Sequence, residues 1–469
     1  MSNPTFGVAI MAAGKGTRLH SRRPKVLHEI GGKALLLHVV DAAKTVAPPH
    51  EIFCIVGHEA ESVRTATAST GVQFVLQAEQ RGTGHALQQV KAHFEATKTS
   101  PPEHLLVLSG DVPLIRPETL ALLRDTHLRE HAAMTILTAV PQDPTGYGRV
   151  LRKSENSCEV AAIVEQKSLA PDQRSIPEIN SGIYCFRTAD LFAQLGKLTD
   201  ANNAKELYLT DVAALLVSEG KRVIAVKGDS VEELLGANTI AEIMHLDATM
   251  RLATAKKLMA QGVTIFRPET CVIDAAVEVD ADTVLEPFTQ LLGATKVGTG
   301  CRIRSFSVVQ DSTLGDRVLL RNGCILDRAA VGEGAILGPY AHLRPGSEIG
   351  PAAHVGNFVE TKNVKLGRGS KANHLTYLGD AEIGEGTNIG AGVITANYDG
   401  VNKHRTVIGN RVFVGSDATL IAPITVDDGA LVAAGSTLTE DVPADSLAIA
   451  RSRQTTKPGW KKSQAAEGS

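Results

Sequence analysis

Aliphatic residues return at every sixth position through residues 297–438, usually with a glycine one place later. A period of six fits neither the 3.6-residue repeat of an α-helix nor the alternation of a short strand. It is typical of a parallel β-helix, in which three hexads form one triangular coil and stacked coils bury a continuous apolar column. The predicted inward positions are Val331, Leu337, Leu343, Ile349, Val355, Leu366, Ala372, Leu378, Ile383, Ile389, Thr395, Ile408, Val414, Leu420, Val426, Val432 and Leu438.

Short apolar runs alternate with segments of helical spacing in the first half of the chain. This alternation is typical of an α/β domain, here predicted to have a Rossmann-like mixed sheet. Helical spacing at 231–260 predicts a long helix that joins this region to the repeats. We place the first domain at 1–240, a helical linker at 241–261 and the repeat domain at 262–469. The predicted strands are Phe6–Met11, 51–56, 72–76, 104–108, 160–165 and 179–186, and the predicted helices are 34–44 and 86–94.

The composition is that of an ordinary soluble protein, with 43% hydrophobic and 21% charged residues among 469. A net charge of −3 gives no reason to expect a nucleic acid or an anionic membrane as partner. Six scattered cysteines without a CxxC pair indicate free thiols in a reducing compartment. We find no signal-peptide pattern and no apolar run near the roughly 20 residues of a membrane span. We therefore expect a cytoplasmic protein.

A glycine-rich loop, AAGKGTR at 12–18, follows the first predicted strand. Backbone N–H groups in such a loop can face phosphate oxygens. It is not a dinucleotide-binding fingerprint, because Leu19 stands where the third glycine belongs, and it is not a P-loop, because a glycine follows Lys15. A plain turn would explain the glycines alone. The nearby cations Lys15, Arg18 and Lys25 favour a triphosphate-binding loop instead.

Asp111 comes directly after the predicted strand at 104–108, in an SGD turn. Ligands of open α/β sheets bind beyond the carboxyl ends of strands, where a carboxylate can hold a divalent metal against phosphates. An aspartate in a turn is more often a simple turn former, but the cationic glycine loop favours the metal interpretation. Glu165 and Asn180 stand on two further predicted strands. Both suit sugar hydroxyls, and both could equally be solvated surface.

Longer motifs carry a resemblance to known enzymes. The strings GKGTR, PKVLH, QAEQRGTGHA, GDVPL, DPTGYGR and EINSGIY resemble those of sugar-1-phosphate nucleotidyltransferases. The later strings LRPG, HVGNFVETK, KANHLTYLGD, NIGAG, ANYDG and FVGSD resemble those of a hexapeptide-repeat acetyltransferase. Over residues 5–455 the chain resembles the family of bifunctional N-acetylglucosamine-1-phosphate uridyltransferase / glucosamine-1-phosphate N-acetyltransferase enzymes.

The resemblance implies two reactions in sequence. Acetyl-CoA first acetylates glucosamine-1-phosphate at a C-terminal site. The product, N-acetylglucosamine-1-phosphate, then reacts with UTP at an N-terminal site, giving UDP-N-acetylglucosamine for peptidoglycan, lipopolysaccharide and lipid A precursors. It also implies a left-handed β-helix and a homotrimer in which each acetyl-CoA site lies between neighbouring prisms.

In the first domain the resemblance implies Mg²⁺ held by Asp111 and Asn238, with Arg18 and Lys25 as catalytic cations on the triphosphate. Positioning and charge neutralisation are expected to do most of the catalysis here, because the attacking sugar phosphate is already ionised. The other implied nucleotide contacts are Met11, Ala12, Ala13, Gly14, Gln77, Gly82 and Thr83, with Ser109 and Gly110 beside the ligand and Gly148, Glu165 and Asn180 on the sugar.

In the repeat domain the resemblance implies His374 as the general base that deprotonates the amine of the acceptor. Without the resemblance, a histidine here would be read as an exposed corner residue. The period breaks between Thr395 and Val407, which predicts a projecting loop with a binding surface. The implied sugar-phosphate contacts are Arg344, Lys362, Tyr377, Asn388 and Glu360, and the implied acetyl-CoA contacts are Ala391, Asn397, Tyr398, Ser416, Ala434 and Arg451.

Two other readings stay open at this point. The first is a monofunctional sugar-1-phosphate nucleotidyltransferase whose β-helix is structural or regulatory. The second is a non-enzymatic binding scaffold with relic sites. The strings around His374, Arg344, Lys362 and Tyr377 argue against the first.

Overall fold

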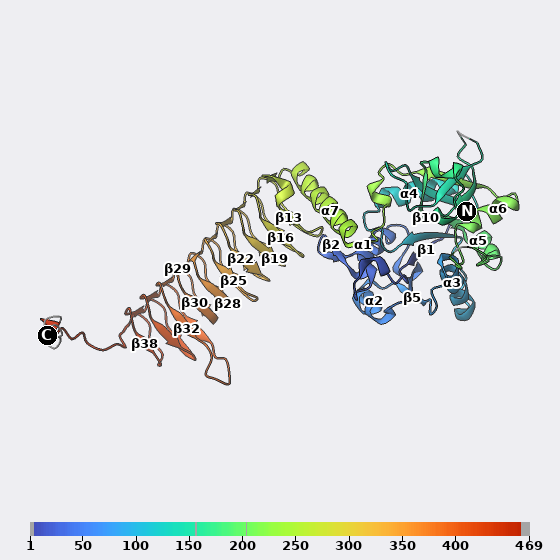
Figure 1. The fold of residues 1–469 in the computed structure, drawn as a ribbon. Helices are drawn as coiled ribbons and strands as arrows, with labels where there is room; N and C mark the ends of the chain where they lie inside the picture. The colour runs from blue at the N-terminus through green and yellow to red at the C-terminus, as the bar shows by residue number, and fades with distance from the viewer. Residues whose placement is uncertain (1–3, 155–156, 203, 461–469) are drawn as a thin grey trace, which may run out of the picture. The chain divides into compact units, whose positions relative to one another are not determined.

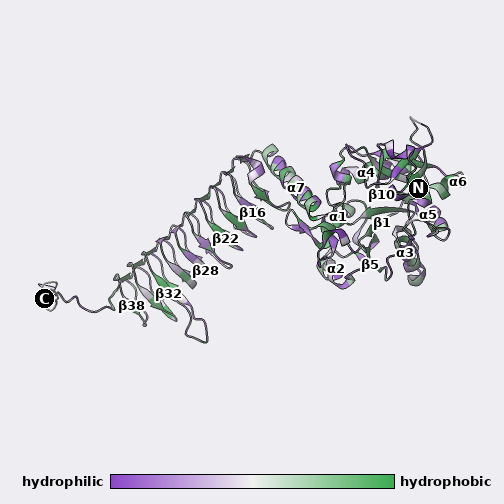
Figure 2. Ribbon diagram, in the orientation of Figure 1, coloured by the Kyte–Doolittle hydropathy of each residue, from purple (hydrophilic) through white to green (hydrophobic). Residues whose placement is uncertain are grey.

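The computed structural model describes residues 4–154, 157–202 and 204–460. The chain forms two compact units, Met1–Met250 and Arg251–Ser469 (Figure 1). The boundary falls within helix α7 (Ile240–Ala260), in the segment predicted as a helical linker. Figure 2 shows hydrophilic and hydrophobic residues interspersed along this helix.

A mixed sheet of nine strands, counted over the described residues, forms the centre of the first unit. Its order is β11-β7-β10-β6-β1-β4-β5, with β8 and β9 branching from β10. The β1–β4, β1–β6, β7–β11 and β4–β5 pairs are parallel, whereas β10 is antiparallel to β6, β7 and β8, and β8 is antiparallel to β9, so the predicted mixed sheet is confirmed. The strands are β1 (Phe6–Met11), β4 (Ile52–Val56), β5 (Gln73–Leu76), β6 (His104–Ser109), β7 (Met134–Ala139), β8 (Arg149–Arg152), β9 (Val160–Val164), β10 (Ile179–Arg187) and β11 (Val223–Lys227).

Helices cover both faces of this sheet. α1, α2 and α4 share one apolar core with the sheet, and α3, α5 and α6 share the other. Strand β1 is covered on both faces, and its sequence, FGVAIM, is accordingly without polar side chains. The helices are α1 (Leu35–Ala43), α2 (Ala60–Thr67), α3 (Thr83–Thr97), α4 (Pro117–Arg129), α5 (Thr188–Leu195) and α6 (Asp211–Ser218).

The prediction of one continuous helix over 231–260 is wrong at its start. A short 3₁₀ turn, η7 (Glu232–Leu234), is followed by an irregular segment, and α7 begins only at Ile240. Thr239 and Glu242 form a capping box there: the Glu242 N–H donates to Thr239 Oγ1 (3.2 Å), and Glu242 Oε2 accepts from the Thr239 N–H (3.2 Å). Such a box fixes the first residue of a helix.

The second unit is a stack of coils from β12 (Thr264–Ile265) to β39 (Leu447–Ala448) (Figure 1). The strands of successive coils pair in parallel, with Leu337 beside Val355 and Val355 beside Ala372. All predicted inward residues are at most 6% exposed, so the hexapeptide β-helix is confirmed. The array starts earlier than residue 297, because the buried series already includes Leu285 and Leu291.

Glycines follow many inward residues because neighbouring coils approach closely. A Cβ on Gly367 would lie 2.5 Å from the backbone carbonyl of Gly384, and one on Gly350 would lie 2.7 Å from the Leu366 carbonyl oxygen. Neither glycine has a positive φ, so the need is for space rather than for left-handed backbone.

Two buried histidines in the first unit give a prediction about acid stability. His104 Nδ1 and His127 Nε2 are 3.1 Å apart, and His127 Nδ1 is 2.8 Å from Thr135 Oγ1. Burial lowers the pKa of His127 to about 3 and also lowers the pKa of His104. In the unfolded chain both imidazoles take up a proton near pH 6.5, whereas the folded chain keeps them neutral to lower pH. The full free energy of unfolding is therefore present above pH 6.5, and part of it is lost as the pH falls towards 3. The cost is at most about 1.4 kcal/mol per histidine per pH unit.

Chemical denaturation of the first unit between pH 7 and 4.5 checks this. We expect His127→Gln to reduce the slope of the unfolding free energy against pH, even if it lowers the free energy itself. Equal slopes for the wild type and His127→Gln would contradict the prediction, since all other titrating groups are unchanged.

Candidate functional site

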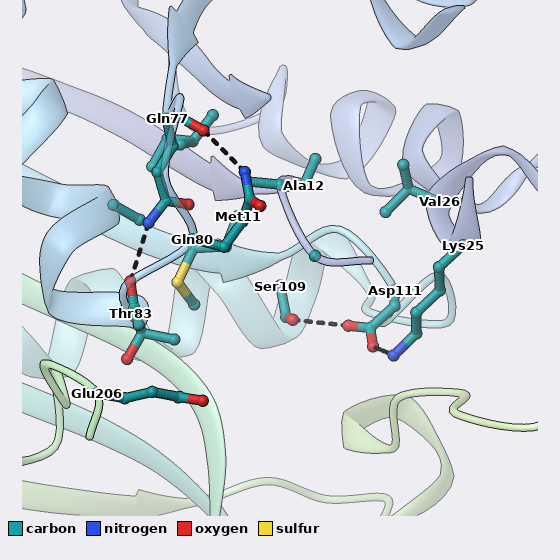
Figure 3. A pocket seen from close by; sticks show the side chains of 15 residues that line it. Met11, Ala12, Lys25, Val26, Gln77, Gln80, Thr83, Ser109, Asp111 and Glu206 are labelled. Atoms are coloured by element: carbon teal, nitrogen blue, oxygen red, sulfur yellow. Dashed lines mark hydrogen bonds and ion pairs between the residues drawn. The ribbon is translucent and has the colours of Figure 1, made fainter. Parts of the chain in front are cut away.

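A cavity of about 280 Å³ opens in the first unit, beyond the carboxyl ends of β1 and β6 (Figure 3). Ten predicted residues of the nucleotide site line it: Met11, Ala12, Ala13, Gly14, Lys25, Gln77, Gly82, Thr83, Ser109 and Asp111. Gly110 lies beside them, because its N–H donates to the Met11 carbonyl (3.0 Å). The strand-end position expected for these residues is thus observed.

The glycine loop brings Lys25 to this cavity. Gly16 has a φ of 61°, and a Cβ there would lie 2.8 Å from the Cβ of Lys25. The loop therefore packs directly against the segment that carries Lys25. By contrast, nothing lies within 4 Å of a Cβ on Gly14, which leaves open space above the loop. Lys15, one of the three cations singled out in the sequence, is exposed and does not line the cavity.

Five polar side chains, from segments that are far apart in the sequence, meet at the end of β6. The Asp111 carboxylate forms an ion pair with the Lys25 ammonium and accepts from Ser109 Oγ (2.6 Å), as Figure 3 shows. Asn238 Oδ1 accepts from Lys25 Nζ (2.9 Å) and from Arg18 Nη2 (2.7 Å). Lys25 thus bridges Asp111 and Asn238, the two predicted metal ligands, although they are far apart in sequence.

This donor set fits a magnesium ion. A carboxylate oxygen and an amide oxygen already face one cation, the Lys25 ammonium. Mg²⁺ prefers such oxygen donors and completes its shell with waters and substrate phosphates. In the described part of the chain no three His, Cys, Asp or Glu side chains gather as a metal cluster. The arrangement therefore suits an ion shared with phosphates rather than a closed metal site.

The three predicted sugar contacts also lie together. A Cβ on Gly148 would be 3.6 Å from Glu165 Oε2 and 3.7 Å from the Asn180 Cβ. Burial raises the pKa of Glu165, whose Oε1 accepts from Thr210 Oγ1 (3.1 Å). The preceding residue, Leu209, donates its N–H to Thr83 Oγ1 (3.0 Å). Residues 209–210 thereby connect the three predicted sugar contacts to Thr83 in the wall of the cavity.

Some lining residues were not predicted from sequence. Gln80 donates to the Gln77 carbonyl (3.0 Å) and lines the cavity with it, in the segment of the QAEQRGTGHA motif. Glu206 faces the cavity from the segment before α6 (Figure 3). Nothing in the local sequence around Glu206 signals this position.

The second set of residues gathers on the β-helix. His374 ends β29 (Lys371–His374) and pairs in register with Asn357 at the end of β27 (His354–Asn357). Its Nδ1–H donates to Asn357 Oδ1 (2.8 Å), which leaves Nε2 free to accept a proton. The His374 side chain is exposed, so a substrate can reach it.

Glu360 and Lys362 lie on β28 (Glu360–Leu366), which pairs with β30 (Tyr377–Ile383), and two further cations approach them from outside these strands. Arg344 Nη1 donates to Glu360 Oε1 (2.8 Å), and Glu360 pairs in register with Tyr377. Contact with the Lys403 ammonium lowers the pKa of Lys362. Two ammonium groups held together repel each other, and an anionic phosphate would relieve that repulsion. Lys403 was not predicted, because it lies within the break in the hexad period, where no repeat indicates its position.

The predicted acetyl-CoA contacts lie in the last coils. Asp417 N–H donates to the Ala391 carbonyl (2.7 Å), Gly435 N–H donates to the Ser416 carbonyl (2.8 Å), and Arg451 Nη1 donates to the Ala434 carbonyl (2.7 Å). Ala391, Ser416, Ala434 and Arg451 therefore follow one another along the stack. Asn388, the remaining sugar contact, precedes them on β31 (Asn388–Ile389), beside Lys371 of β29.

The break in the period forms a loop that projects from the stack beside β32 (Ile394–Ala396) (Figure 1). Asn397 lies at its base, where its Nδ2 donates to Asp380 Oδ2. Tyr398 is 61% exposed on the loop itself. The predicted projecting loop is therefore confirmed, and it carries Lys403 as well.

Of the residues that the structure describes, none forms a helix with the length and hydropathy of a membrane span.

Comparison with known proteins gives matches to both halves. Residues 8–211 match the MobA-like NTP transferase domain. The chain is 57% identical to "Bifunctional protein GlmU" of Koribacter versatilis, over 99% of this chain and 98% of that protein. It is 47% identical to the protein of that name from a Cyanothece species, over 97% of this chain and 98% of that protein. A solved nucleoside-diphosphate-sugar pyrophosphorylase from Vibrio cholerae matches at 17% identity and a TM-score of 0.41, over 51% of this chain and 99% of that chain.

Proposed function

This chain belongs to the family of bifunctional GlmU proteins, and on that premise we propose which of its residues perform each of two reactions. The enzyme acetylates glucosamine-1-phosphate with acetyl-CoA and transfers UMP from UTP to the resulting N-acetylglucosamine-1-phosphate, releasing pyrophosphate. It uses Mg²⁺ in the second reaction. The monofunctional and scaffold alternatives are not favoured, because bifunctional relatives match the chain over nearly its full length.

The uridylyl transfer site is the cavity of the first unit. The phosphate oxygen of N-acetylglucosamine-1-phosphate attacks the α-phosphorus of UTP, and pyrophosphate leaves. The glycine loop would bind the phosphates through its N–H groups, and Arg18 and Lys25 would balance the triphosphate charge. Bound at Asp111 and Asn238, Mg²⁺ would neutralise charge on the phosphates. Lys25 would then move from those oxygens to the phosphates, since both cations compete for the same place.

Two sets of residues would give this site its substrate specificity, one for the uracil ring and one for the sugar. Gln77 and Gln80 carry amides in the cavity wall that suit the edge of a uracil ring. Gly148, Glu165 and Asn180 would hold the sugar, with the absence of a Cβ at Gly148 leaving room beside Glu165. Glu165 also accepts from Thr210, so that its carboxylate is directed before a sugar binds.

The acetyl transfer site is on the β-helix. His374 Nε2 would take a proton from the ammonium of glucosamine-1-phosphate, and the free amine would attack the thioester of acetyl-CoA. The bond from His374 Nδ1–H to Asn357 supports this role, because it fixes the tautomer that a base requires. Arg344, Lys362 and Lys403 would bind the phosphate of the acceptor. The implied sugar contacts Tyr377, Asn388 and Glu360, and the acetyl-CoA contacts Ala391, Asn397, Tyr398, Ser416, Ala434 and Arg451, complete the proposed site.

The observation that carries the uridylyl assignment is the convergence of Asp111, Lys25 and Asn238 at the end of β6. Mass spectrometry of a mixture of enzyme, glucosamine-1-phosphate, acetyl-CoA, UTP and magnesium tests the whole scheme. We expect N-acetylglucosamine-1-phosphate, free CoA thiol, UDP-N-acetylglucosamine and pyrophosphate. A well-folded sample that converts UTP and supplied N-acetylglucosamine-1-phosphate, but releases no thiol from acetyl-CoA, would support the monofunctional alternative instead.

We further propose that the β-helix forms a homotrimer. One corner of the stack carries a row of exposed apolar side chains: Phe288, Phe306, Tyr340, Phe358 and Leu375. The rings of Phe288 and Phe306 are stacked 5.3 Å apart, and those of Tyr340 and Phe358 are stacked 5.6 Å apart. An extended apolar row of this kind is typical of an interaction surface. Leu375 directly follows His374, so association there would enclose the acetyl transfer site.

Light scattering coupled to size exclusion tests this. We expect three chains for the wild type and for Phe358→Tyr, which keeps the ring, and fewer for Phe358→Glu, because a carboxylate would be buried without a partner. A wild-type mass of one chain would exclude the trimer.

The cytoplasm is the proposed location of the enzyme. UTP and acetyl-CoA are available there, and free thiols persist in a reducing compartment.

A further inference from the structure

We propose that Glu242 is a positioning residue for uridylyl transfer, which holds the backbone of Asn238 so that its amide oxygen faces the cation site at Asp111. This inference rests on the proposed role of Asn238. Glu242 lies at the start of α7, outside the cavity lining, and its side chain is exposed.

The contacts of Glu242 reach beyond an ordinary capping box. In such a box the carboxylate accepts from the N-cap residue, here the N–H of Thr239 (3.2 Å). Glu242 Oε2 also accepts from the N–H of Asn238 (2.5 Å). One carboxylate oxygen thus fixes two successive peptide units, and the first of these belongs to Asn238.

The segment 233–238, which leads into α7, is also held at its N-terminal end. Glu233 is buried, accepts from Thr119 Oγ1 (2.6 Å) and pairs with Arg116. Next to Asp111, the Ala237 N–H donates to the Asp111 carbonyl (3.3 Å), and a Cβ on Gly236 would lie 3.1 Å from Asp111 Oδ2. The segment therefore lies closely against Asp111, and Glu242 fixes the point where it turns into the helix.

The bond to Glu242 becomes most important when substrate binds. The Asn238 side chain is held only by Arg18 and Lys25 among the hydrogen bonds that the structure describes for it. Both are the cations proposed to take up the triphosphate charge. Once they move to phosphates, the backbone bond to Glu242 remains to fix Asn238. Groups that orient a metal ligand typically change metal affinity by about 10- to 100-fold when they are removed.

The test measures metal binding directly. Mn²⁺ is titrated into the full-length enzyme with UDP-N-acetylglucosamine and followed by electron paramagnetic resonance, with thermal unfolding recorded for each variant. We expect Glu242→Ala to raise the Kd for Mn²⁺ about tenfold. Glu242→Gln should stay within about threefold of the wild type, because a glutamine oxygen can accept the same two N–H groups.

Thr239→Ala is the matched control. It removes the helix cap but leaves the bond from the Asn238 N–H to Glu242, so it should lower the melting temperature about as much as Glu242→Ala does while changing the Kd by less than about twofold. Equal weakening by Thr239→Ala and Glu242→Ala would mean that helix stability alone matters, and would overturn the proposal. Equal weakening by Glu242→Gln and Glu242→Ala would overturn it too, since charge would then be the cause.

Asn238→Ala separates this inference from its premise. We expect it to weaken Mn²⁺ binding at least as much as Glu242→Ala does. If Asn238→Ala weakens binding and Glu242→Ala does not, positioning by Glu242 is wrong while the proposed site stands. If Asn238→Ala has no effect on the Kd, Asn238 is not a metal ligand and the premise itself fails.

Discussion

Replacing Asp111 with alanine is expected to lower the rate of uridylyl transfer about 1,000-fold or more, which corresponds to about 4 kcal/mol of transition-state stabilisation. The carboxylate is the one charged oxygen donor proposed for Mg²⁺, and it also balances Lys25. Its loss would leave an ammonium without its partner in a site that must hold a metal. Acetyl transfer should stay within about twofold of the wild type, because the residues proposed for it belong to the other compact unit.

Pyrophosphate release from UTP and N-acetylglucosamine-1-phosphate measures the first activity, and thiol release from acetyl-CoA measures the second. Asp125→Ala is the control for removal of an acidic residue, since Asp125 is exposed on α4 and pairs only with its neighbour Arg124 among the described ion pairs. It should leave both rates unchanged. An Asp111→Ala enzyme that releases pyrophosphate at the wild-type rate would remove Asp111 from the mechanism.

The second large effect is expected at His374. His374→Ala should slow acetyl transfer about 10²- to 10⁴-fold, the usual contribution of a general base. His374→Gln should lose as much, although it can still donate to Asn357, because an amide cannot take a proton. Uridylyl transfer should remain within about twofold in both variants and serves as the measure of correct folding.

The orienting residue Asn357 allows a finer test of the same mechanism. Asn357→Ala keeps the imidazole but removes the acceptor for its Nδ1–H. We expect an intermediate loss of acetyl transfer, about tenfold, because the base is present but less well oriented. If His374→Ala and Asn357→Ala both leave thiol release intact, the base must lie elsewhere. If either variant abolishes both activities, the assignment of the two reactions to separate units is wrong.

The spacing of hydrophobic residues along the chain predicts buried positions correctly wherever the fold repeats regularly. The sixfold period identifies the inward residues of the β-helix, since each coil repeats the same three short sides and only one position per side faces inward. Strands such as β1 and β6 are recognisable for the same reason, because a strand covered on both faces must be apolar throughout. The sequence motifs alone identify most of the residues that line the cavity.

Three features were not predicted correctly, each for its own physical reason. The helix over 231–260 was predicted too long, because its apolar spacing continues through residues 234–235 while a capping box starts the helix at Ile240. Lys403 was missed because it approaches Lys362 across a loop whose path no periodicity describes. Glu206 was missed because its segment reaches the cavity from another part of the chain.

The sequence by itself thus determined the two folds, their order and the chemical types available to each site. Only the tertiary structure decided which side chains meet: Lys25 between Asp111 and Asn238, Asn357 beside His374, and Glu242 on the backbone of Asn238. The physical reason is that hydrophobic spacing is a local property that repeats along the chain. Contacts between polar groups far apart in sequence depend instead on the path of everything folded between them.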